Sequence, residues 1–154
     1  MRLDCPLTVL ESTLEWLRQA GELNHEGIVL LLGRRGDDGD VVVLEAYRPE
    51  HSAEADRFHI PRESMTVLLE HLRRERLMVA AQVHSHPEAA FHSAADDALA
   101  IVRHVGALSF VVPRFARTTR PENFLRESAV FELNSGNRWL RLSAEALERR
   151  CGIR

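Results

Sequence analysis

Two histidines separated by a single residue, His84 and His86, are the first candidates for chemistry in this chain. Alternate residues of a strand emerge from the same face, so two such imidazoles at a strand end can converge on one ion. A catalytic zinc site takes about three protein ligands and leaves a position for water, and the nearest further donors are the carboxylates of Asp96 and Asp97. Two histidines and one aspartate therefore predict a hydrolytic metal site.

The same residues also have an ordinary interpretation. A His-x-His pair occurs by chance, and aspartates at the start of a helix commonly interact with its free amides. Ser93 is a good helix N-cap, and Asp96 follows it within one helical turn. The third nearby imidazole, His92, lies in a loop and out of step with the histidine pair, and we interpret it as a surface or supporting residue.

The elements that must position these residues follow from the hydrophobic pattern. Residues 78–83 are mostly apolar without a helical period, which predicts a buried strand whose C-terminal end presents His84 and His86. A helix is predicted from Ser93 to about His104. Further helices are predicted at 8–20, 61–76 and 144–150, a strand at 107–112, and hairpins from 28–32 with 41–44 and from 129–133 with 138–142.

This order interleaves helices with strands but lacks the regular βαβ alternation of a doubly wound sheet. The sequence therefore predicts an α/β fold with a mixed sheet. Residues 48–60 and 113–127 have no regular pattern and are candidate binding loops.

Length and composition restrict the class of protein. A chain of 154 residues, 45% hydrophobic and 28% charged, is typical of one soluble globular domain, here 1–154. Its formal net charge of -3 disfavours nucleic acid as a partner, because a phosphate backbone requires a strongly basic face.

The cysteines and the N-terminal segment bear on the cellular compartment. Cys5 and Cys151 lack the close spacing of a structural zinc site or a disulfide framework, so we interpret them as free thiols. The N-terminal segment is interrupted by Asp4, Glu11 and Glu15 and lacks the apolar core of a secretory signal. The longest apolar stretch, 27–33, is too short to span a membrane, so we expect a cytoplasmic protein without membrane association.

The segment from His84 to Pro87, followed by Ser93 and Asp96, resembles the motif H-[ST]-H-P…S-x-x-D of the JAMM (MPN-plus, or JAB) zinc metalloproteases. Upstream, the segment that begins at Glu26 is similar to the part of the family sequence in which a catalytic glutamate precedes an apolar strand ending in glycine. The resemblance extends over residues 26–112 and is nearest to the compact prokaryotic JAB proteins.

The resemblance implies a single-domain JAMM/MPN-like fold of the cytidine-deaminase-like type, with a mixed sheet flanked by helices. It implies one Zn²⁺ per chain, held by His84, His86 and Asp96. It further implies that Glu26 acts as general base and that Ser93 donates a hydrogen bond to the tetrahedral intermediate.

Two departures from the family pattern leave alternatives open. The spacer between His86 and Ser93 is one residue shorter than in the commonest form, so counting forward from His86 favours Asp97, whereas the S-x-x-D spacing favours Asp96. The frequent Cys-Gly after the glutamate is absent. Without the family pattern Glu26 would be interpreted as a solvated residue before a strand, and Glu22 is the alternative base.

The substrate is implied by the resemblance alone. It is the amide bond after the C-terminus of a ubiquitin-like protein, cut in deconjugation or precursor processing. The implied partners are that modifier, its conjugates, and E1-like and E2-like enzymes of a bacterial antiviral defence operon. Two alternatives remain: a JAMM peptidase that acts on a sulfur-carrier protein or small peptide, and a non-catalytic MPN scaffold, which typically lacks ligands of the motif.

Overall fold

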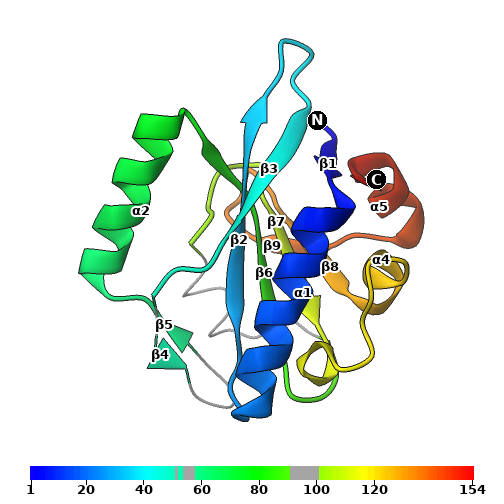
Figure 1. The fold of residues 1–154 in the computed structure, drawn as a ribbon. Coiled ribbons are helices and arrows are strands. Elements are labelled where there is room, and N and C mark those ends of the chain that lie inside the picture. Colours follow the sequence, from blue (N-terminus) through cyan, green and yellow to red (C-terminus); the bar gives the residue numbers. More distant parts are fainter. Residues whose placement is uncertain (51, 54–57, 91–100) are drawn as a thin grey trace.

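A computed structural model of the chain describes residues 1–50, 52–53, 58–90 and 101–154. Its centre is an eight-stranded mixed sheet, and two further strands form a separate ribbon (Figure 1). The strands of the large sheet are β1 (Leu3–Cys5), β2 (Ile28–Arg35), β3 (Val41–Tyr47), β6 (Met78–Ser85), β7 (Leu108–Val112), β8 (Ala129–Leu133), β9 (Trp139–Arg141) and β10 (Cys151–Ile153), and those of the ribbon are β4 (Ser52–Ala53) and β5 (Phe58–His59). The order in the large sheet is β10-β1-β3-β2-β6-β7-β8-β9.

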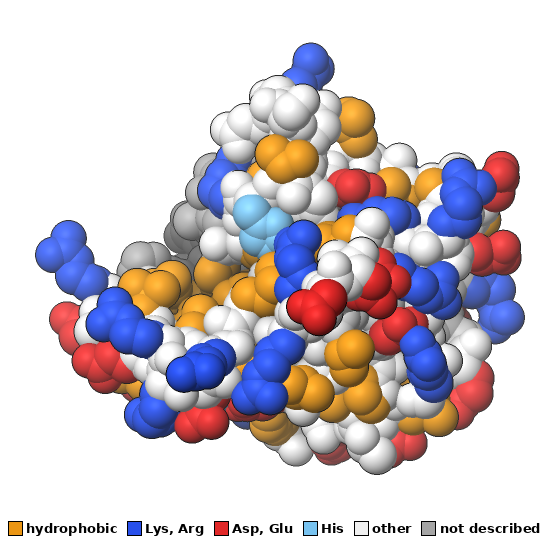
Figure 2. Space-filling view, turned by 90° about the horizontal axis from the view of Figure 1, so that it is seen from above, with side chains coloured by type: hydrophobic (Ala, Val, Ile, Leu, Met, Phe, Trp, Pro, Cys, Tyr) orange, Lys and Arg blue, Asp and Glu red, His pale blue; other side chains and the backbone are white. Residues whose placement is uncertain are grey.

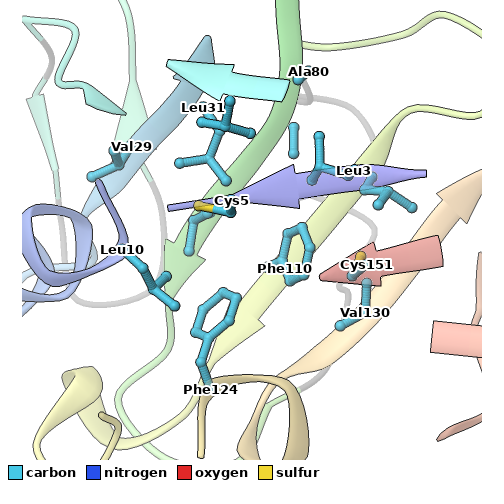
Figure 3. Close-up of a cluster of buried hydrophobic side chains, with 14 of the residues drawn as sticks. Leu3, Cys5, Leu10, Val29, Leu31, Ala80, Phe110, Phe124, Val130 and Cys151 are labelled. Carbon is cyan, nitrogen blue, oxygen red and sulfur yellow. The ribbon is translucent and has the colours of Figure 1, made fainter. Parts of the chain in front are cut away.

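Helices cover both faces of this sheet. On β2, alternate residues point to opposite faces, so Val29 and Leu31 join the core cluster beneath α1, whereas Leu30 and Leu32 pack against Leu68 of α2. Figure 3 shows the larger cluster, to which strands from the middle and one edge of the sheet contribute. The described helices are α1 (Leu7–Glu22), α2 (Arg62–Glu75), α4 (Phe124–Glu127) and α5 (Ala144–Arg150).

The C-terminal ends of β6 and β7 and the start of β2 lie at the same end of the sheet. Strands β2 and β6 are antiparallel with Ile28 opposite His84, and β6 and β7 are parallel with Ser85 opposite Val112. Antiparallel pairing places the start of β2 beside the end of β6. The chain that leaves α1 therefore reaches the sheet next to the two histidines.

The predicted mixed α/β architecture is confirmed, and strand β6 extends further than predicted, so that His84 lies within it. The helix predicted from 93 to 104 is wrong over residues 101–104, where the chain is not helical, and its earlier part lies outside the described residues. In place of a helical bond, the Ile101 N–H donates to Gln82 Oε1 over 3.0 Å. Strands β1, β4, β5 and β10 and helix α4 were not predicted.

The outer surface of the described residues is mixed in character. Figure 2 shows arginine and acidic side chains interspersed on one face, with hydrophobic side chains between them. None of the helices within the described ranges has both the length and the apolar character that a membrane crossing requires.

Candidate metal centre

The two histidines lie side by side in the protein interior. His84 is 0% and His86 is 4% exposed, and their ring centroids are 5.2 Å apart with an angle of 50° between the ring planes. His84 is the last residue but one of β6 and His86 directly follows the strand, so both rings lie at the same end of it, as their spacing of two predicts. Two adjacent imidazoles are donors of the kind that zinc takes, so the chemistry of this pair fits that metal ion.

Glu26 approaches the histidine pair from the neighbouring strand. Its carboxylate is 1% exposed, and Oε1 lies 3.4 Å from Nε2 of His86. Helix α1 ends in a turn at Asn24, whose φ is 58°, and the N–H of His25 donates to the Ala20 carbonyl. This turn redirects the chain so that Glu26 lies two residues before β2 and next to His86.

Ser85, between the two histidines, fastens the chain beside Glu26. Its hydroxyl is fully buried and accepts a hydrogen bond from the Gly27 N–H over 2.9 Å. In return, the Ser85 N–H donates to the Gly27 carbonyl over 3.1 Å. This reciprocal pair holds the chain that carries Glu26 against the strand end that carries the histidines.

A second set of main-chain bonds supports the strand end from the side of β7. The His86 N–H donates to the Val112 carbonyl over 2.9 Å, and the Phe115 N–H donates to the His86 carbonyl over 2.8 Å. The Arg114 N–H donates to the Glu88 carbonyl over 2.8 Å. The main chain of His86 is thus hydrogen-bonded on both its amide and its carbonyl.

The turn that supplies these donors has an unusual conformation. Arg114, Phe115 and Ala116 have φ angles of 52°, 51° and 60°, so three consecutive residues other than glycine lie in the left-handed region. For L-residues this region costs about 1–2 kcal/mol each, and such residues are ordinarily isolated. The surrounding structure must therefore hold the turn in place.

The chain that follows the undescribed segment 91–100 is also tied to β6. Gln82, two residues before His84, is 0% exposed, and its Nε2 donates to Ser109 Oγ over 3.1 Å while its Oε1 accepts from Ile101. Nε2 of His104 lies 3.2 Å from the Val79 carbonyl oxygen. Both contacts place the start of the described segment 101–154 against β6.

A cavity of about 350 Å³ lies beside Glu26. Because β2 separates β3 from β6 in the sheet, this cavity flanks Glu26 on the side away from the histidine pair. Apolar side chains of α1 and polar side chains from the segment after β3 share its wall. The lining residues are Ala20, Leu23, His25, Glu26, Arg48, Pro49 and Glu50.

Three of the predicted site residues, Glu26, His84 and His86, are brought together. The alternative base, Glu22, is exposed at the end of α1. Within the ranges that the structure describes, no group of three or more histidine, cysteine or acidic side chains is arranged to hold a metal. The remaining predicted site residues lie outside the described residues: His92, Ser93, Asp96 and Asp97.

Sequence reasoning did not identify Ser85 or Phe115 as parts of the site. The place of Ser85 between the two histidines was a signal only that its side chain leaves the strand on the opposite face from theirs, and its bond to the Gly27 N–H could not be read from that spacing. The local sequence of Phe115 carries no comparable signal.

Comparisons with known proteins identify the family and the fold. Residues 10–127 match the family model described as prokaryotic homologs of the JAB domain. The chain is 34% identical over 149 residues to the "Probable metalloprotease y4jG" of Sinorhizobium fredii (strain NBRC 101917 / NGR234), which covers 95% of this chain and 88% of that protein. The solution structure of protein DSY2949 from Desulfitobacterium hafniense matches in fold, with a TM-score of 0.68 and 20% identity over 99% of this chain and 92% of that one.

Proposed function

Because the chain belongs to the family of prokaryotic homologues of the JAB domain, we propose that it is a zinc-dependent metallopeptidase. The observation that supports this proposal most strongly is the buried Glu26 carboxylate, 3.4 Å from the imidazole of His86 in an adjacent histidine pair. A non-catalytic scaffold has no need for this arrangement, whereas hydrolysis requires a base next to the metal ligands.

The proposed ligand set is His84, His86 and Asp96, with Asp96 preferred to Asp97 because the S-x-x-D spacing is kept. Zn²⁺ held by these residues would supply a Lewis acid that lowers the pKa of water and polarises a carbonyl. Two of these proposed ligands are imidazoles of described residues, and the third is a carboxylate, which is a usual donor set for a catalytic zinc.

Glu26 is the proposed proton carrier of the reaction. It accepts a proton from the attacking water and returns it to the departing amine. Its burial keeps bulk water away, and its position two residues before β2 and next to His86 keeps it close to the reacting atoms. Ser93 is the proposed hydrogen-bond donor to the tetrahedral intermediate.

The proposed substrate is the amide bond after the C-terminal tail of a ubiquitin-like protein, which would make the chain an isopeptidase or precursor-processing peptidase. Resemblance to the JAMM family supports this choice. The proposed partners are the modifier, its conjugates, and E1-like and E2-like enzymes of an antiviral defence operon. A sulfur-carrier protein or small peptide is the alternative substrate.

The experiment is a cleavage assay with zinc-loaded protein on ubiquitin-like proteins that carry an amide-linked fluorophore at the C-terminus. Glu26→Gln should keep its zinc and its fold while turnover falls by about 10²- to 10⁴-fold, because the proton carrier is lost. Glu22→Gln is the matched control and should cleave normally, since Glu22 is exposed. Near-normal cleavage by zinc-loaded Glu26→Gln would contradict the proposed role.

A further inference from the structure

Resting on the proposed function, we propose that the left-handed turn Arg114–Ala116 is a positioning element that holds His86 at its distance from Glu26. The site has two arms, the segment that carries His86 and the segment from the end of α1 to Glu26, and the turn contacts each of them. One contact is a hydrogen bond to the main chain of His86, and the other is a packing contact with the end of α1, which leads into Glu26.

The contact with His86 depends on the conformation of the turn. The Phe115 N–H donates to the His86 carbonyl over 2.8 Å, and the preceding N–H, of Arg114, donates to Glu88. The φ values of 52° at Arg114 and 51° at Phe115 set the directions of these main-chain groups, and a turn of successive left-handed residues can present consecutive amides to neighbouring acceptors.

The contact with the other arm is made by the Phe115 side chain and Gly21. Phe115 is 2% exposed, and a Cβ added at Gly21 would lie 2.4 Å from the Phe115 Cβ and 3.3 Å from its carbonyl oxygen. Only glycine allows this approach. Gly21 belongs to the last turn of α1, so Phe115 packs against the segment from which the chain continues to Glu26.

The turn is also fastened from outside. The Arg114 guanidinium donates to Glu127 Oε2 over 3.2 Å and to Thr118 Oγ1 over 3.0 Å, and the Arg117 guanidinium carbon lies 5.6 Å from the centre of the Phe115 ring. Arg114 and Arg117 therefore contact other side chains of the candidate binding loop 113–127. This part of the loop supports the turn. An unfavourable conformation that is held from several sides and joins both arms of a site is typical of a positioning element.

The experiment compares Phe115→Leu with Phe124→Leu. Both phenylalanines are fully buried, so both changes should reduce stability by a similar cavity effect, but Phe124 belongs to α4 and stacks on Phe110 in the core, whereas Phe115 belongs to the turn that is bonded to His86. Cobalt(II) replaces zinc as the probe, because its visible absorption reports ligand geometry. Phe115→Leu should bind cobalt about tenfold more weakly than Phe124→Leu and shift the absorption bands.

Gly21→Ala provides a second variant if Phe115→Leu does not fold. Alanine is compatible with the helix, but its Cβ would overlap Phe115, so the change displaces the turn without opening a cavity. It should therefore also weaken cobalt binding and shift the absorption bands. Cobalt affinity and bands equal to those of Phe124→Leu in the folded variants would overturn the positioning role alone. Absence of cobalt binding by the unaltered protein would overturn the proposed function together with it.

Discussion

At the scale of single residues, the position of Glu26 depends on a neighbour that does no chemistry. Ser85 Oγ accepts the Gly27 N–H in a fully buried place, and this bond joins the chain carrying the base to the strand carrying both histidines. A buried N–H that loses its acceptor costs about 1–3 kcal/mol unless the chain moves to find another. Movement of the Gly27 main chain would carry Glu26 with it.

We therefore expect Ser85→Ala to lower kcat by roughly ten- to hundredfold with little change in KM, because a misplaced base slows proton transfer without affecting substrate binding. Ser85→Thr retains the hydroxyl and should restore most of the rate. The control is Ser143→Ala, which removes the N-cap of α5 and costs comparable stability far from the base. Equal losses of kcat in both alanine variants would show that only stability had changed.

At the scale of elements, the sequence was informative where the hydrophobic pattern is long and local. Strands β2, β3 and β6 were predicted from short apolar runs, and helices α1 and α2 from apolar residues at helical spacing. Strands β1 and β10 were missed because three residues carry no usable period, and their pairing joins the two ends of the chain, with Leu3 opposite Cys151. Long-range pairing of this kind leaves no local signal.

In the candidate site, too, features that depend on long-range contacts could not be predicted from the sequence. The spacing of two along a strand predicted that His84 and His86 lie together, whereas Glu26 was singled out by the family resemblance alone, and the structure brings all three together. The left-handed turn at Phe115 could not be predicted, since Arg-Phe-Ala contains no residue that favours a positive φ. Tertiary contacts with Gly21 and His86 determine that conformation.

At the scale of the whole molecule, the first and last strands, β1 and β10, pair with each other and contribute side chains to the core. Cys5 and Cys151 are both buried free thiols on paired strands, as Figure 3 shows, which confirms their predicted free state. Burial raises the pKa of each thiol from 9.0 to about 12. In the unfolded chain the same thiols lose their protons near pH 9, so the unfolded state binds fewer protons than the folded state between these two values.

The free energy of unfolding should accordingly be insensitive to these thiols below pH 9 and fall as pH rises from 9 toward 12. At pH 10 the expected loss is about 1 kcal/mol for each thiol. Urea denaturation at pH 8 and pH 10 measures it, and the decrease should be smaller in Cys5→Ala than in the unaltered protein. An equal decrease in both proteins would assign the pH dependence to other groups, such as Tyr47, whose pKa burial also raises.

The most direct test of the metallopeptidase account is the zinc content of protein purified without chelator. The account predicts one zinc per chain, loss of that zinc in the His84→Ala/His86→Ala variant, and greater loss in Asp96→Ala than in Asp97→Ala, because two imidazoles and one carboxylate form the proposed ligand set. Circular dichroism should show that the variants remain folded. Full zinc occupancy in the folded His84→Ala/His86→Ala variant would contradict the account.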